Sequence, residues 1–303
     1  MNLVIKLLII AVCISVLFYL FGRLRSISDE LTIEQIQNIS PVSYPGHFRI
    51  ATYNIAHGRG PKLDGSNWDG EWEQKKLGLI EIGKYLKTKN IDIVVLNEVD
   101  FSASWSGNLD QARIVAETGG YPYFVRQTNY DLFLPGFSLQ FGNALLSRYP
   151  VKTAKRERLP PYKPAEPWFY GNHDALRVEI DLGATEISVW GLHLDVRDEQ
   201  ARVQAIEHVL NNLKDDQHTI LAGDLNSRPA TNNEATAYST LAAYNHLISF
   251  PLIDSKHNTF PSEKPGRIID WIFYSPQFRF KTGDVPGIHY SDHLPVLVEL
   301  EIR

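Results

Sequence analysis

Tyr290-Ser291-Asp292-His293-Leu294-Pro295 is the stretch around which the rest of the chain is organised. It precedes a strand-like run from Val296 to Leu300, and Pro295 fixes the backbone behind Asp292 and His293. In a loop, unlike in a strand, neighbouring side chains can both turn toward one pocket. A carboxylate suits a hard cation, and a neutral imidazole can take a proton from water. A polar turn that caps an edge strand is the simpler interpretation, so the other strand ends have to decide.

Five further strand-like segments end in, or contain, a polar residue of a catalytic type. These residues are Asn54, Glu98, His193, Asp224 with Asn226, and Asp270. Because strand ends lie along one edge of a sheet, we expect the side chains that follow them to converge there. Turn formation explains most of them equally well. Asp270 is different, because it lies in the apolar run Ile268 to Phe273, where an unpaired carboxylate is very costly.

These residues are suited to metal-assisted hydrolysis of a phosphate ester. Glu98 and Asp292 offer carboxylate oxygens to Mg²⁺ or Mn²⁺, and Asn54 offers a neutral oxygen, directly or through water. We therefore predict that Asn54, Glu98 and Asp292 are the metal ligands.

The other five residues are predicted to be catalytic. Pairing with Asp270 would fix the tautomer of His293, which then removes a proton from the attacking water. Asp224 and Asn226 would place that water and hold a phosphoryl oxygen. His193 would donate a hydrogen bond to a phosphoryl oxygen and offset the charge of the transition state.

Composition sets broad limits on the protein. The 303 residues are 44% hydrophobic and 21% charged, which is ordinary for a globular protein. The first 25 residues hold three basic residues and no acidic one, so the remainder has 27 basic and 35 acidic residues, a net charge of −8. Such a charge argues weakly against non-specific DNA binding. A single cysteine, Cys13, excludes an intrachain disulfide.

The N-terminus contains an uninterrupted apolar run, Leu7 to Phe21. Adding Leu3 to Ile5 across Lys6 gives 19 residues, which as a helix span roughly 28 Å. This favours an uncleaved membrane anchor over a signal peptide, for which Ser26 to Ser28 offers a possible cleavage site. We predict an anchor over residues 1–25, a tether over 26–47 and a catalytic domain over 48–303. The expected localisation is a single-pass membrane protein with an extracytoplasmic domain.

Hydrophobic periodicity predicts helices interleaved with more numerous strands. The helices are expected over residues 71–87, 110–118, 198–213 and 234–248, and the strands over 48–54, 91–96, 142–147, 175–180, 186–192, 218–222, 268–274 and 296–300. This order indicates one mixed α/β domain built on sheets.

Seven short motifs follow one another between residues 52 and 295. They are Thr52–Ile55, Leu96–Asp100, Gly142–Pro150, Gly191–Leu194, Gly223–Asn226, Arg267–Ile272 and Ser291–Pro295. The ordered set resembles the endonuclease/exonuclease/phosphatase superfamily, which has the deoxyribonuclease I-like fold. The resemblance implies a four-layered α/β sandwich of two packed mixed β-sheets flanked by helices. It also implies the same roles for the eight residues above.

Some residues depart from the family pattern. Asn97 stands where the family more often has Gln, and both are amides. His57-Gly58 and Asp110-Gln111 resemble a bacterial-type subgroup.

The substrate is a phosphodiester in the two leading hypotheses. The first is a lipid or lipid-linked phosphodiester at a membrane surface, suggested by the apolar N-terminus and by the aromatic stretch Pro167 to Tyr170. The alternative is an envelope-anchored nuclease that hydrolyses DNA or RNA. A phosphatase of inositol phosphates is less favoured, because the sequence shows no cluster of Lys and Arg suited to several phosphates. A non-catalytic binding module is the least favoured, and we expect a monomer without an evident protein partner.

Overall fold

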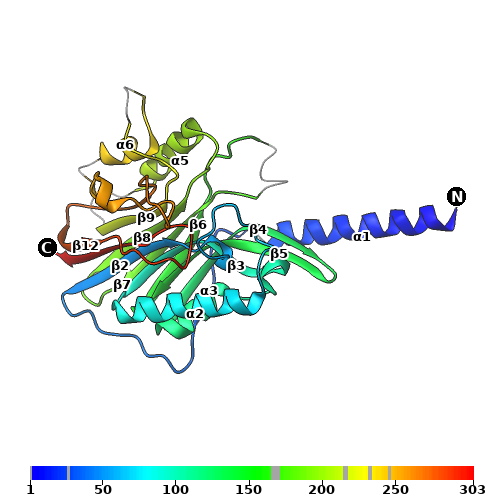
Figure 1. The fold of residues 1–303 in the computed structure, drawn as a ribbon, viewed down its shortest axis with the longest axis horizontal. Coiled ribbons are helices and arrows are strands. Elements are labelled where there is room, and N and C mark those ends of the chain that lie inside the picture. Colours follow the sequence, from blue (N-terminus) through cyan, green and yellow to red (C-terminus); the bar gives the residue numbers. More distant parts are fainter. Residues whose placement is uncertain (1, 26–27, 165–170, 214–217, 231–233, 245–246) are drawn as a thin grey trace.

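The computed structural model describes residues 2–25, 28–164, 171–213, 218–230, 234–244 and 247–303. Two β-sheets pack face to face, and helices cover the outer face of each (Figure 1). The covering helices are α2 (Trp72–Thr88) and α3 (Gln111–Gly119) on one sheet, and α5 (Glu199–Asn211) and α6 (Ala237–Ala242) on the other. The predicted four-layered α/β sandwich is therefore confirmed.

The first sheet has seven strands in the order β1-β4-β5-β3-β2-β13-β12. Their bounds are β1 Ile33–Gln35, β2 His47–Asn54, β3 Ile93–Ala103, β4 Tyr123–Leu134, β5 Phe137–Ser147, β12 Phe278–Asp284 and β13 Val296–Ile302. The β2–β3 pair is parallel and the other pairs are antiparallel, so the sheet is mixed. Strand β1 lies within the segment predicted to be a tether, and it forms one edge of this sheet.

The second sheet has six strands in the order β10-β11-β9-β8-β7-β6. Their bounds are β6 Val151–Glu157, β7 Ala175–Asp181, β8 Glu186–His193, β9 His218–Asp224, β10 Ile248–Phe250 and β11 Asp270–Tyr274. Only β8 and β9 run parallel. Short 3₁₀ helices occur at η1 Ala56–Gly58, η2 Ser104–Ser106 and η3 Ser255–His257.

The apolar core has three parts. The central part lies between the sheets and includes Ile50, Val95 and Val189, all fully buried. The outer parts join each sheet to its helices, for example through Leu79 of α2 and Ile206 of α5. Because both faces of each sheet are covered, the inner strands are continuous apolar runs, and each buried side chain contributes about 1.5–3 kcal/mol.

The helix predicted over residues 234–248 is shorter in the structure. A capping box at Thr236 begins α6, which ends at Ala242, and β10 follows at Ile248. Strand β10 pairs with β11, and Phe250 packs between the two sheets. Tertiary packing therefore overrides the local helical pattern here.

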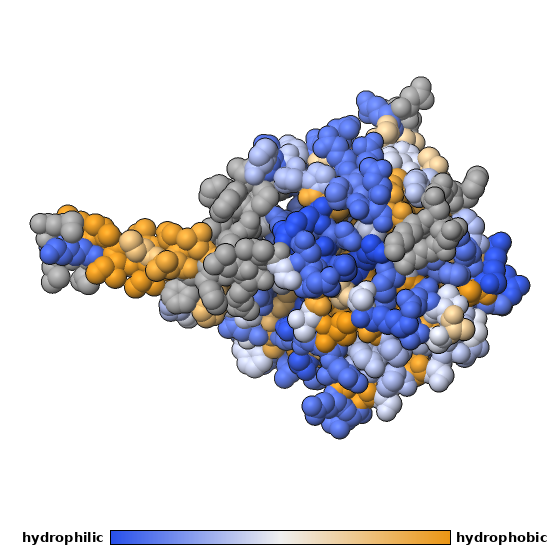
Figure 2. Space-filling view, turned by 180° about the vertical axis from the view of Figure 1, so that it is seen from behind, coloured by the Kyte–Doolittle hydropathy of each residue, from blue (hydrophilic) through white to orange (hydrophobic). Residues whose placement is uncertain are grey.

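The predicted membrane anchor lies in α1 (Leu3–Arg25), which projects from the sandwich beside β4 and β5 (Figure 1). Apolar residues run along this helix (Figure 2), but it also contains charged Lys6, Arg23 and Arg25. Within the described residues, no helix has the length and apolarity needed to cross a membrane. The prediction of a single-pass membrane protein with an extracytoplasmic domain is therefore wrong.

Candidate active site

The eight predicted site residues come from both sheets and meet at one end of the sandwich. The seven-stranded sheet supplies Asn54 at the end of β2, Glu98 in β3, and Asp292 and His293 just before β13. The six-stranded sheet supplies His193 at the end of β8, Asp224 and Asn226 at and after the end of β9, and Asp270 at the start of β11.

A cavity of about 1420 Å³ lies at this end of the sandwich. Six of the eight residues line it, namely Glu98, His193, Asp224, Asn226, Asp292 and His293. Asn54 and Asp270 are fully buried behind the wall. The wall thus carries the groups that can touch a substrate, and the two residues behind it can act only through them.

His293 and Asp270 form a buried pair across the two sheets. The Nδ1–H of His293 donates to Oδ2 of Asp270 at 2.9 Å, with Oδ1 at 3.1 Å. The Nε2 atom lies 3.7 Å from Oδ2 of Asp224, so a carboxylate flanks each side of the ring. Burial lowers the pKa of His293, but the charges of Asp270 and Asp224 outweigh it and raise the pKa to about 10.

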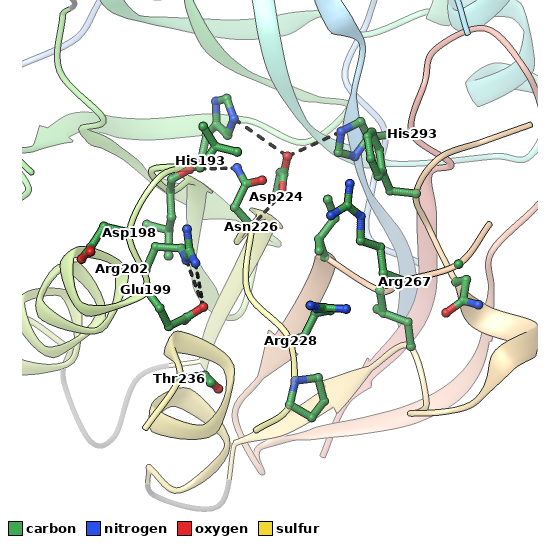
Figure 3. Close-up of a pocket in the computed structure, with 18 of the residues that line it drawn as sticks. His193, Asp198, Glu199, Arg202, Asp224, Asn226, Arg228, Thr236, Arg267 and His293 are labelled. Carbon is green, nitrogen blue, oxygen red and sulfur yellow. Dashed lines mark hydrogen bonds and ion pairs between the residues drawn. The ribbon is translucent and has the colours of Figure 1, made fainter. Parts of the chain in front are cut away.

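Asp224 occupies the centre of the site (Figure 3), with His193 on one side and His293 on the other. It pairs in register with Asp270 on β11. Burial and the charge of Asp270 raise the pKa of Asp224 to about 7. The backbone N–H of Asn226 donates to Oδ1 of Asp224 at 2.8 Å and fixes the carboxylate.

Asn226 and Asn54 both hold neighbouring groups. The Nδ2 of Asn226 donates to the carbonyl of Leu194 at 2.9 Å. The Nδ2 of Asn54 donates to Glu98 and to Asp224, each at 3.1 Å. The Oδ1 of Asn54 accepts from its own chain, from the N–H two residues on, at 3.0 Å. Asn54 therefore presents a donor to the two carboxylates, and ligation of a metal through its oxygen would require its amide to turn over.

A β-bulge sets the direction of the Glu98 side chain. The register of β3 against β5 shifts between Leu96 and Val99, so Asn97 and Glu98 oppose a single residue of β5. Glu98 has a φ of 52°, a strained left-handed conformation for this residue type. A regular strand would send its side chain to the other face. The bulge instead lets Glu98 line the cavity while Asn97 points between the sheets.

Three histidines surround Glu98. Burial raises the pKa of Glu98, but the charges of His57, His193 and His293 outweigh it and lower the pKa to about 2. Glu98 is therefore ionised throughout the physiological range. His193 lies 3.8 Å from Glu98 and 3.9 Å from Asp224 through Nε2. The pKa of His193 is lowered, chiefly by burial, so its imidazole is neutral at pH 7 and carries a charge only in the acidic range in which Glu98 titrates.

Asp292 is the second carboxylate in the wall. Burial raises its pKa, as does the charge of Glu98, while His293 and Arg59 lower it. The Nη2 of Arg59 donates to Oδ2 of Asp292. Glu98 and Asp292 thus repel each other inside one cavity. Two mutually repelling carboxylates fit a hard divalent cation with oxygen ligands.

A second grouping of possible ligand atoms consists of Asp224, Asp270 and His293, whose atoms lie within 4.8 Å of one another. The Nδ1–H of His293 already donates to Asp270 there, so that nitrogen has no lone pair for a metal. The pair of His293 and Asp270 is suited to act as a base with its orienting acid, and Glu98 with Asp292 is the alternative place for a cation.

His57 and Asp100 form a second buried pair that sequence reasoning did not assign to the site. The Nδ1 of His57 lies 2.7 Å from Oδ1 of Asp100, and its Nε2 lies 3.5 Å from Oε2 of Glu98. Trp105 donates to the other oxygen of Asp100 at 2.8 Å. Burial lowers the pKa of His57, but the hydrogen bond and the charge of Asp100 outweigh burial, so the pKa is raised from its ordinary value. The signal was available in His57-Gly58, which served only as a mark of the subgroup.

Asn97 ties the two sheets together beneath the site. Its Nδ2 donates to Oδ1 of Asn143 at 2.8 Å and to the carbonyl of Leu192 at 3.0 Å. Its Oδ1 accepts from the N–H of Asp224 at 3.0 Å. One fully buried amide of β3 thus fixes the ends of β8 and β9, which carry His193 and Asp224.

Comparison with known proteins identifies the family. The chain matches the Endonuclease/Exonuclease/phosphatase family over residues 51–293. No curated protein matches it.

Solved structures share the fold. The endonuclease/exonuclease/phosphatase from Beutenbergia cavernae is 23% identical with a TM-score of 0.62, over 84% of this chain and 72% of that one. The human Nocturnin catalytic domain with bound sulfate is 18% identical with a TM-score of 0.61, over 90% of this chain and 97% of that one. The mannosyl-6-phosphatase Bt3783 of Bacteroides thetaiotaomicron is 20% identical with a TM-score of 0.60, over 84% and 99%. The chain therefore belongs to the endonuclease/exonuclease/phosphatase family, whose members are metal-dependent hydrolases of phosphoester bonds.

Proposed function

We propose that the protein hydrolyses a phosphodiester with a water molecule activated by His293. The observation that carries this proposal is the hydrogen bond from Nδ1 of His293 to the fully buried Asp270. It fixes the tautomer, so Nε2 is the nitrogen left to accept a proton in the cavity. Nε2 and Oδ2 of Asp224 are 3.7 Å apart, and both groups face the space where the attacking water would lie.

The cation would be held by Glu98 and Asp292. Once bound, Mg²⁺ or Mn²⁺ would supply Lewis-acid polarisation of a phosphoryl oxygen, and its positive charge would favour the neutral form of His293. Asn54 keeps Glu98 and Asp224 in place through its two hydrogen bonds.

The opposite side of the site stabilises the phosphoryl group. His193 is neutral because burial lowers its pKa, so its Nε2–H can donate to a phosphoryl oxygen. Asp224 orients the attacking water, and Asn226 keeps the Asp224 carboxylate in place. These roles divide the reaction between the two sheets.

The choice of substrate now has different support. The hypothesis of a lipid-linked substrate rested on the predicted anchor, which is corrected above, and on the stretch Pro167 to Tyr170, which lies outside the described residues. The nuclease alternative rested on the family resemblance. We therefore propose phosphodiester hydrolysis as the function and leave the choice between the two substrate classes to one assay panel.

The full-length chain should be assayed with bis-p-nitrophenyl phosphate, DNA, RNA and phospholipid vesicles, with Mg²⁺ and with EDTA. We expect hydrolysis that EDTA abolishes and that His293→Ala lowers by about 10²–10⁴-fold. His289→Ala, an exposed histidine four residues earlier, is the matched control. Activity that survives EDTA, or a His293→Ala rate within a few-fold of wild type, would refute the mechanism.

A further inference from the structure

Four arginines line the same cavity, namely Arg59, Arg202, Arg228 and Arg267. Arg202 is paired with Glu199 of its own helix. Arg59 is engaged, because it donates to Asp292 and to the carbonyl of Gly65. Arg228 and Arg267 are exposed, and neither guanidinium forms an ion pair or a hydrogen bond with any residue that the structure describes. Among the described residues, the cavity therefore presents two arginine side chains that form an ion pair with no carboxylate.

Three acids of the same wall, Asp198, Glu199 and Asp254, already have other partners. Glu199 accepts from Ser227 and from an arginine of its own helix. Asp198 caps α5 by accepting from the N–H of Ala201 at 2.8 Å. Asp254 accepts from backbone N–H groups of η3 and from a histidine there. Their charges are thus used locally and are not directed at the two free guanidinium groups.

Arg267 is held beside the proposed base. Its guanidinium lies 4.5 Å from the centre of the Phe260 ring, and that ring lies 4.6 Å from the ring of His293. Figure 3 shows Arg267 pointing toward Asp224 and His293, with Arg228 in the same cavity farther from them. Arg267 therefore lies next to the reacting centre, and Arg228 lies farther from it in the same cavity.

We propose that Arg228 and Arg267 bind a second phosphate of the substrate, next to the phosphodiester that is cleaved. A guanidinium group binds a phosphate through two parallel N–H donors, and it keeps its charge at any physiological pH. A chain with a net charge of −5 is a poor general trap for polyanions, so these two cations serve a particular group of the ligand. The proposal rests on the proposed function, because it assigns a second subsite to the same substrate.

The second phosphate could belong to a nucleotide or to a phosphorylated sugar alcohol, so the kinetic test uses one pair of compounds for each source. The first pair is dithymidine monophosphate without and with a 5′-phosphate, and the second is glycerophosphoinositol without and with a ring phosphate. We expect kcat/KM to rise at least about tenfold with the extra phosphate in one pair. Arg228→Ala with Arg267→Ala should bring that ratio close to one. Arg279→Ala, an arginine of β12 outside the cavity, should leave the ratio unchanged.

Binding provides a readout that does not depend on turnover. Titration calorimetry of the full-length, EDTA-treated protein should show pyrophosphate bound at least about tenfold more tightly than inorganic phosphate, and the double variant should lose this preference. Ratios within twofold in both kinetic pairs, with the single-phosphate compounds still hydrolysed, would overturn the second subsite and leave the proposed function standing. If no diester is hydrolysed, the proposed function fails, and equal binding of pyrophosphate and phosphate would then refute the subsite as well.

Discussion

Asp270→Asn tests the site most directly, because it removes one charge and keeps the shape. Asp270 is fully buried, and its oxygens lie 2.9 and 3.1 Å from Nδ1 of His293. An opposite charge at such a distance raises the pKa of an imidazole by about 1–3 pH units, or about 1.4–4 kcal/mol. The substitution should therefore lower the pKa of His293 and weaken its hold on the correct tautomer. We expect kcat to fall by about 10²–10⁴-fold, which is about 3–5 kcal/mol of activation free energy.

The assay is hydrolysis of bis-p-nitrophenyl phosphate with saturating Mg²⁺ across a range of pH. The acidic limb of the pH–rate profile should move to lower pH in Asp270→Asn, because a base of lower pKa loses its proton earlier. Asp284→Asn, an exposed aspartate of β12, is the control for the loss of one charge. Thermal melting should show that the variant remains folded. A kcat within a few-fold of wild type, or an acidic limb that does not move, would show that Asp270 does not act through His293.

Two further predictions concern stability. The metal-free protein should lose stability as the pH rises from about 6.5 to about 10. The reason is that the pKa of His293 is about 10 in the folded state and lies above its unfolded value, so the stabilisation is complete only below the unfolded pKa. Denaturant titrations at a series of pH values measure the free energy of unfolding, and a His293→Gln variant whose stability falls with pH as steeply as that of wild type would contradict this. Asn97→Leu should cost about 2–6 kcal/mol of unfolding free energy, because the N–H of Asp224 and the carbonyl of Leu192 lose their buried partner. Chemical denaturation measures this loss. A loss below about 1 kcal/mol would be evidence that Asn97 does not tie the two sheets together.

The parts of the site that the sequence predicted depend on local signals. A carboxylate in an apolar strand needs a partner, so Asp270 pointed to His293, and the two are hydrogen-bonded. Strand ends pointed to Asp224 and His193, which the structure brings within 3.9 Å. Both arguments use only the chemistry of a residue and its immediate neighbours in the chain.

The parts that the sequence could not predict depend on contacts between distant segments. The strand expected to end at residue 96 continues through a bulge, and only pairing with β5 reveals it. Arg228 and Arg267 form no basic cluster in the sequence, yet they line one cavity. The helix expected over residues 234–248 gives way to β10 because Phe250 is needed between the sheets. The anchor was predicted from a single apolar run, and that prediction is wrong.

The division of the site between the two sheets has a consequence for how the protein comes into being. Asn54, Glu98, Asp292 and His293 belong to one sheet, and His193, Asp224, Asn226 and Asp270 to the other. The buried side-chain amide of Asn97 joins the two sheets through its hydrogen bonds to the backbone of Leu192 and of Asp224. A chain that has formed both sheets but has not docked them carries every one of these residues and has no active site. Hydrolytic activity thus reports on the closure of the sandwich as a whole, and a newly made molecule is inert until its two halves meet.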